Sequence, residues 1–131
     1  MSRGRRLLVR SILSAALAAG CTNASDSNPP AERQQPVIRV TGQGSDERNS
    51  VCQGFRLSEE QAREFFSRSV SITEKELHDD YDYLPCWVEG TTTTGGDSAR
   101  WKIRAGATAE VERADGTVEW RGCKSCGELF E

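Results

Sequence analysis

Residues 101–121 read WKIRAGATAEVERADGTVEWR and carry the clearest structural signal in the chain. Over residues 101–105, apolar side chains alternate with basic ones, which is the period of two expected of a half-buried β-strand. Further on, Asp115-Gly116 separates residues 109–113 from residues 117–121, and an Asp-Gly turn between two β-rich segments is typical of a β-hairpin. The stretch therefore predicts three consecutive antiparallel strands.

The pairing register of this hairpin depends on the length of its turn. A two-residue turn at Asp115-Gly116 would place Val111 opposite Trp120, and a three-residue loop would place it opposite Glu119. Apolar side chains that face each other across two strands stabilise a sheet, whereas a carboxylate opposite a valine does not. We therefore expect the two-residue turn.

A further strand and two helix starts precede this stretch. Residues 86–93, CWVEGTTT, are rich in β-branched and aromatic residues, and residues 95–98, GGDS, have the composition of a turn. Ser58 with Gln61, and Thr73 with Glu76, have the spacing of the capping box that begins many helices. The second helix must end before Pro85, because the residue before a proline disfavours the helical conformation. We therefore expect an α+β fold, in which two short N-terminal helices are followed by a four-stranded antiparallel meander.

The N-terminal segment has the pattern of an export signal. Arginines precede a short apolar run, Ser11 to Ala19, which is far shorter than the roughly 20 residues that span a bilayer. Leu17-Ala18-Ala19-Gly20-Cys21 then resembles the lipobox of bacterial lipoprotein signal peptides, although the usual leucine position holds Ala18. The resemblance implies cleavage after Gly20, lipidation of Cys21 and anchoring in a membrane by several acyl chains. An ordinary signal peptide cut near Ala18 or Gly20 is the alternative.

The remaining chain divides by composition. Thr22 to Pro36 has almost no apolar residue and cannot bury a core. Val37 to Val40 could add an edge strand, but Gly42 to Ser45 would interrupt it. We therefore expect a signal peptide at residues 1–20, a lipidated cysteine with a flexible tether at residues 21–49, and one folded domain at residues 50–131.

Charge limits the partners of this domain. The chain has 17 basic and 20 acidic side chains, and residues 1–20 hold four arginines and no acid. Removing those residues leaves 13 basic and 20 acidic side chains, a formal net charge of −7. Such a surface disfavours nucleic acid, which binds basic proteins. The lipobox implies an envelope protein that faces the periplasm, and Thr22 after the lipidated cysteine favours the outer membrane.

Four further cysteines predict disulfides, because an even number in a small exported domain is typical of a disulfide framework. They are Cys52, Cys86, Cys123 and Cys126. A meander brings the start of its first strand and the end of its fourth to one end of the sheet. We therefore expect one bridge from Cys52 and one from Cys86 to the Cys123/Cys126 pair, provided that the sheet curls enough to bring the Cα atoms within about 7 Å.

Cys123-Lys124-Ser125-Cys126 is also a C-x-x-C motif, so thiol–disulfide exchange is an alternative. Redox motifs of the thioredoxin type precede a helix, and only Gly127 to Glu131 follow here. A zinc site from the four cysteines, with His78, is a further alternative, although it is less expected in an oxidising compartment. We expect structural cysteines.

No motif in the sequence predicts catalysis. A hydrolytic triad would have to use His78, the only histidine, and no serine lies in a G-x-S-x-G motif. Asp79, Asp80 and Asp82 lack the alternating pattern of a calcium loop, and the sequence has no phosphate-binding glycine motif. We expect a solvated His78, no catalytic or metal-binding residue and no cofactor.

The folded half also resembles small exported bacterial proteins of unassigned function. The resemblance rests on YDYLPC at residues 81–86, Gly90, WKIRAG at residues 101–106, Asp115-Gly116 and the CKSC motif, and it implies no activity. The sequence thus predicts a non-enzymatic interaction or structural domain anchored in the envelope, with an envelope protein as its partner. The alternatives are a thiol-redox protein that uses Cys123 and Cys126, or an inhibitor of an envelope protein or toxin.

Overall fold

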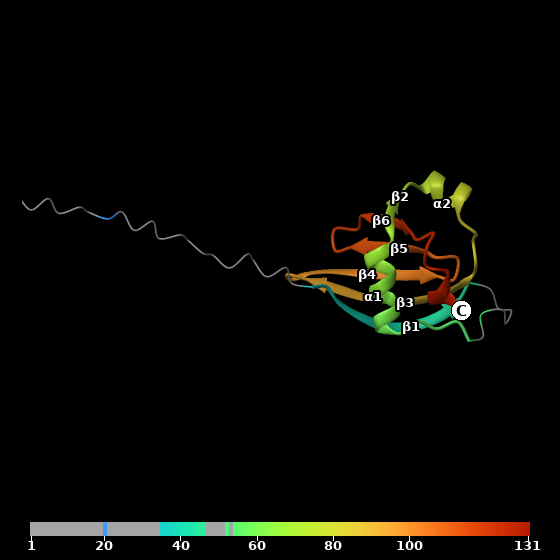
Figure 1. The fold of residues 1–131 in the computed structure, drawn as a ribbon, viewed down its shortest axis with the longest axis horizontal. Coiled ribbons are helices and arrows are strands. Elements are labelled where there is room, and N and C mark those ends of the chain that lie inside the picture. Colours follow the sequence, from blue (N-terminus) through green and yellow to red (C-terminus); the bar gives the residue numbers. More distant parts are fainter. Residues whose placement is uncertain (1–19, 21–34, 47–51, 53) are drawn as a thin grey trace, which may run out of the picture. The chain divides into compact units, whose positions relative to one another are not determined.

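The computed structural model describes residues 20, 35–46, 52 and 54–131. One antiparallel sheet of six strands dominates them, in the order β1-β3-β4-β5-β6-β2 (Figure 1). The elements in chain order are β1 (Val37–Ser45), α1 (Glu59–Arg68), β2 (Val70–Ile72), α2 (Glu74–Asp80), β3 (Cys86–Thr94), β4 (Asp97–Arg104), β5 (Thr108–Arg113), β6 (Val118–Gly122) and the 3₁₀ helix η2 (Gly127–Phe130).

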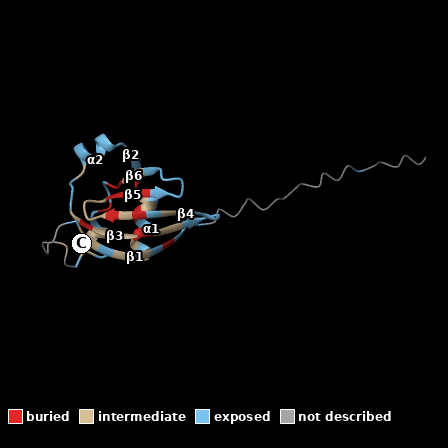
Figure 2. Cartoon of the chain, turned by 180° about the vertical axis from the view of Figure 1, so that it is seen from behind, coloured by how far each residue is buried: buried red, intermediate tan, exposed pale blue. Residues whose placement is uncertain are grey.

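The core lies between one face of the sheet and α1, which crosses the strands (Figure 1). Ala62 and Phe65 of α1 are fully buried, because their spacing puts both on the side of the helix that faces the sheet. The buried residues from the strands include Ile38, Val88, Trp101, Ile103, Ala109 and Val111. In β3 and β4 they alternate with half-buried or exposed side chains on the other face, whereas in β5 Thr108 is buried as well. Buried positions are therefore concentrated in the central strands, as Figure 2 shows.

The expected fold, two N-terminal helices followed by a four-stranded meander, is wrong. The four strands β3 to β6 form the middle of a larger sheet, which β1 extends on one side and β2 on the other. Both helices come after the first strand. The two additional strands escape sequence analysis because one is interrupted by glycines and the other has only three residues between two helices.

Residues 37–45, which we assigned to the tether, form the edge strand β1. The strand continues through Gly42 and Gly44 because a bulge at Thr41 takes up the irregularity, after which Gly42 pairs with Glu89. Ile38 is only 1% exposed, so this strand contributes to the core. The folded domain therefore includes residues that lie before the expected boundary at residue 50.

The expected register of the hairpin is also wrong, because Val111 pairs with Glu119. The connection is a three-residue loop in which Gly116 has a φ of 84°, a conformation that glycine adopts without strain. The Asp115 carboxylate stabilises this loop by accepting a hydrogen bond from the Thr117 backbone N–H at 2.9 Å. The Glu119 carboxylate forms ion pairs with Arg113 and Arg121. These pairs offset the free-energy cost that we had expected from a carboxylate opposite Val111.

Both predicted capping boxes are present. The Ser58 hydroxyl accepts from the Gln61 backbone N–H at 3.1 Å, and the Gln61 side chain accepts from the Ser58 N–H at 2.9 Å. Thr73 and Glu76 repeat this arrangement at the start of α2. Only α1 is packed into the core, since α2 has no buried residue.

Candidate functional site

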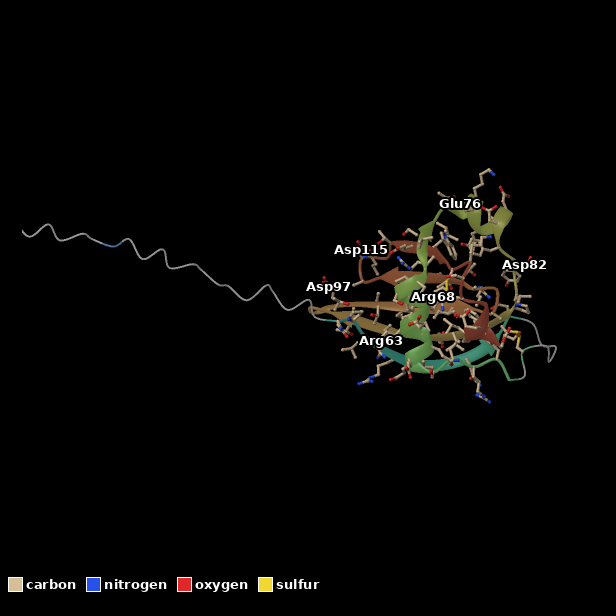
Figure 3. The ribbon with its side chains drawn as sticks, viewed as in Figure 1. Arg63, Arg68, Glu76, Asp82, Asp97 and Asp115 are labelled. Carbon is tan, nitrogen blue, oxygen red and sulfur yellow. A yellow bond between two sulfur atoms is a disulfide. The ribbon has the colours of Figure 1, made fainter. Side chains whose placement is uncertain are left out.

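A hollow of about 320 Å³ lies between α2, the loop that follows it and the face of the sheet opposite α1. We call it the α2 hollow. Its walls combine aromatic rings, carboxylates and one arginine with smaller side chains such as Thr108. The side chains used below are Glu74 and His78 from α2, Tyr81, Asp82 and Tyr83 from the loop, and Arg104, Glu110 and Trp120 from the sheet. Figure 3 labels Asp82, on the loop that forms one wall.

Two glycines let the loop lie directly on the sheet. A Cβ atom on Gly122 would come within 2.3 Å of the Tyr81 ring, and a Cβ atom on Gly106 would come within 2.2 Å of the Asp82 carbonyl oxygen. Lys124 adds a third contact, because its ammonium group donates to the Asp80 carbonyl and lies 4.1 Å from the centroid of the Tyr81 ring. The wall is therefore held in place before any ligand binds.

Arg104 is oriented by a cluster of polar side chains, which we call the Asp46 cluster. The Asp46 carboxylate accepts hydrogen bonds from the Tyr83 hydroxyl and from Arg104, both at 2.6 Å, and from the Trp87 ring N–H at 3.1 Å. The hydrogen bond from Tyr83, with the neighbouring Arg104, holds the pKa of Asp46 below its ordinary value. The guanidinium of Arg104 also lies 5.1 Å from the centroid of the Tyr83 ring. This cluster joins the end of β1 to β3, β4 and the loop.

The remaining groups of the α2 hollow are less involved in hydrogen bonds with other side chains. Trp120 is half-buried, and its ring N–H has no hydrogen-bond partner among the described residues. Burial raises the pKa of the Tyr81 hydroxyl, and the nearby carboxylate of Asp80 raises it further. His78 is exposed, as the sequence predicts, but it lies at the edge of the hollow. The arrangement provides aromatic surface and negative charge to a small ligand group.

A second hollow, of about 650 Å³, lies on the α1 side of the sheet. Its floor is apolar, and Asp97 at the start of β4 and Asp115 in the turn between β5 and β6 border it (Figure 3). Its charged groups bind one another, because the Arg121 guanidinium donates to Glu119 at 2.7 Å and to the Ser69 hydroxyl and carbonyl at 2.8 and 2.6 Å. A hydrogen bond from Ser71, with the contacts to Arg121 and Arg113, holds the pKa of Glu119 below its ordinary value. This network joins β6 to β2 and the end of α1, so we assign it a structural role.

The four cysteines form two disulfides, and the expected pairing is wrong. Cys52 binds Cys86, and Cys123 binds Cys126, with Cα atoms 5.0 and 5.5 Å apart. Two strands separate β3 from β6, a distance of roughly 14 Å at about 4.8 Å per strand. Cys52 instead follows β1, the direct neighbour of β3, where Ser45 pairs with Cys86.

Both sulfur atoms of the C-x-x-C motif lie in the core. Cys123 is 3% exposed and Cys126 is fully buried. Thiol–disulfide exchange requires that a thiolate reaches one of the sulfur atoms, so burial disfavours the redox alternative. The short helix η2 that follows packs Phe130 against Phe65, with ring centroids 6.1 Å apart. This disulfide therefore fastens the C-terminal segment to the core.

The other sequence predictions stay open or have no counterpart in the described residues. Cys21, the predicted lipidation site, lies outside them. Within residues 35–46, 52 and 54–131, no three His, Cys, Asp or Glu side chains are placed to hold a metal ion. Nor does any helix of the described chain have the length and apolar character needed to cross a membrane.

Comparison with protein families, curated proteins and solved structures finds no match to this chain. The resemblance to small exported proteins therefore stays a prediction. Tyr81 to Tyr83 and WKIRAG, which includes Arg104, belong to the residues that carry this resemblance, and the resemblance implies no role for them. The sequence predicted Trp120 as the partner of Val111 in the hairpin. The signal that was missed is the pairing of large rings with glycines, which marks close contact only after the strands are in register.

Proposed function

We propose that the chain is a lipid-anchored protein of the bacterial cell envelope, whose folded domain faces the periplasm and binds a partner protein through the α2 hollow. The hollow carries the binding part of the proposal, because its wall is fixed in advance at Gly106, at Gly122 and by the Asp46 cluster. Preorganised sites lose less conformational entropy when they bind.

The anchoring part rests on the sequence. Cys21 lies at the end of a segment that resembles a lipobox, and diacylglycerol with a further acyl chain holds a protein firmly on a membrane. The tether then comprises residues 21–36, because β1 begins at Val37. Thr22 favours the outer membrane as the location.

Membrane fractionation tests the anchor. The wild-type chain should fractionate with membranes as a processed, lipid-labelled species, and Cys21→Ser should be released or left unprocessed at Gly20. A processed and lipid-labelled Cys21→Ser protein in the membrane fraction would contradict this part of the proposal.

Site-specific photo-crosslinking tests the binding function. A photoreactive phenylalanine analogue at His78, which is exposed at the edge of the α2 hollow, should form a discrete adduct with an envelope protein. The control is the same analogue at Arg63, an exposed residue of α1 (Figure 3). Equal adducts at both positions, or none at His78, would remove the support for the hollow as the binding site.

A further inference from the structure

We infer that the α2 hollow receives the guanidinium group of an arginine on the partner protein. The inference rests on the proposed function and assigns the ligand chemistry of the same site. Three observations carry it: the aromatic surface, the sign of the charge and the size of the hollow.

Aromatic rings in and near the hollow already bind cations. Three rings, Tyr81 and Tyr83 of the loop and Trp87 of β3, have a basic side chain within the distance of a cation–π contact, and Trp120 has none among the described residues. The contacts, measured to the ring centroid, are Lys102 on Trp87 at 4.6 Å, Arg104 on Tyr83 at 5.1 Å and Lys124 on Tyr81 at 4.1 Å. Tryptophan is the strongest ring for this contact and arginine its most frequent cation, so Trp120 offers an unused cation site in the hollow.

The fixed charges of the hollow attract a cation. Glu74, Asp82 and Glu110 contribute three carboxylates, whereas Arg104 is the single arginine and is neutralised by Asp46 at 2.6 Å. Glu110 pairs directly with Trp120 across β5 and β6, and its nearest cation, Lys102, is 3.8 Å away. A guanidinium that lies on the Trp120 ring would therefore have a carboxylate beside it.

The volume suits one side chain. About 320 Å³ is at the small end of ligand pockets, which span roughly 300–1,000 Å³. Arginine fits the chemistry better than lysine, because its planar group stacks on a ring and donates several hydrogen bonds in a fork at the same time. The carboxylates come from three separate elements, α2, the loop and β5.

The test is a titration of the chain after residue 20, with Cys21→Ser, by an end-blocked tripeptide with a central arginine. Binding of the peptide is followed by NMR through the indole N–H resonance of Trp120. The resonance is assigned by its loss in Trp120→Phe, since the chain has three tryptophans. Arginine should give a saturable shift and bind more tightly than the same peptide with lysine. The citrulline peptide, which keeps the shape and lacks the charge, should not saturate.

Two variants with a matched control localise the site. Trp120→Ala lacks the indole probe and is followed instead through the backbone resonances of residues around the hollow, and it should weaken binding about 5- to 30-fold, the range expected for a partly desolvated cation–π contact. Glu110→Gln should weaken it about two- to fivefold and reduce its dependence on salt. Glu112→Gln is the control, because Glu112 lies two residues away on the same strand and face, outside the hollow, and is paired with Arg100 at 2.8 Å. It should bind like the unchanged chain.

Each outcome decides the inference. Binding that is equal for arginine and citrulline, no saturable shift with arginine, or tighter binding of choline than of the arginine peptide would overturn it. The same holds if Glu112→Gln weakens binding as much as Glu110→Gln. If the His78 crosslink forms in any of these cases, the binding function stands and only the ligand chemistry fails. If the crosslink is absent too, both fail.

Discussion

The two edges of the sheet are built differently. At one edge, the nine-residue strand β1 buries Ile38, contacts α1 and leads to the Cys52–Cys86 disulfide. At the other, β2 has three residues and no buried side chain, and the adjacent α2 buries none either. We call these the β1 edge and the β2 edge.

The β1 edge is also protected against pairing with other chains. Glu59 of α1 accepts from the backbone N–H of Val40 at 3.4 Å and binds Arg39 at 3.2 Å, which covers part of the unpaired strand. The β2 edge instead has the α2 hollow beside it. The difference is that the edge strand that packs on the core and the hollow proposed for binding lie toward opposite edges of the sheet.

The largest expected effect is the loss of the β1 edge. A chain that begins at Ser50 lacks β1 and with it Ile38, which is 1% exposed. It should lose cooperative unfolding, because a small domain has few kcal/mol of stability to lose. A chain that begins at Gln35 should keep it. Thermal melts by circular dichroism compare the two, and a cooperative melt of the Ser50 chain would show that β1 is dispensable.

The next effect concerns the disulfide at the β1 edge. Cys52→Ala with Cys86→Ala opens a link across 34 residues, which costs about 4 kcal/mol in the chain-entropy model. His78→Ala, at the β2 edge, should change the free energy of unfolding by less than about 0.5 kcal/mol, because the side chain is exposed. Denaturant titration measures both. Similar losses in the two variants would contradict the asymmetry between the edges.

The two capping boxes should differ although their local geometry is the same. Ser58→Ala should reduce the global free energy of unfolding by about 1 kcal/mol, because α1 belongs to the core. Thr73→Ala should leave global unfolding nearly unchanged and should accelerate hydrogen exchange in α2, which can open on its own. Equal global losses would mean that α2 unfolds together with the sheet.

The smallest effect is a dependence on pH that the capping box of α2 should have and the capping box of α1 should lack. Hydrogen bonds from the Thr73 backbone and side chain hold the pKa of Glu76 below its ordinary value. A lowered carboxyl pKa stabilises the folded helix above the unfolded pKa of about 4.3, and this contribution is lost as the pH falls through the folded pKa.

Hydrogen exchange of α2 measured against pH checks this expectation. Protection, corrected for intrinsic exchange, should fall on acidification in the wild-type chain and stay level in Glu76→Gln, which keeps the box without the charge. The box of α1 uses Gln61 and should not respond. A pH response that persists in Glu76→Gln would assign it to another group.

Local features of this chain could be predicted from the sequence. The capping boxes at Ser58 and Thr73 depend on side chains three residues apart, so no tertiary contact is needed to recognise them. The strands between residues 86 and 121 likewise follow from alternation and turns. For the candidate site, the sequence marked the loop at residues 81–83 only within a resemblance, and it treated His78 as a solvated residue.

Other features depend on contacts between distant segments. The register at Gly116 was missed because Glu119 gains its partners, two arginines of β5 and β6 and Ser71 of β2, only after these strands have assembled. The disulfide pairing was missed because it follows from the pairing of β1 with β3. The α2 hollow combines side chains from α2, the loop and three strands, and no spacing along the chain relates them.

The sequence by itself determined where the helices begin, where the central strands lie and which cysteines are available to pair. Tertiary structure alone decided which strands flank the meander, which sulfur atoms meet and where the loop after α2 lies over glycines at positions 106 and 122. The physical reason is the sequence separation over which each interaction acts. Capping and alternation act over a few residues, whereas the sheet edges, the disulfides and the hollow arise from segments tens of residues apart that share one buried surface.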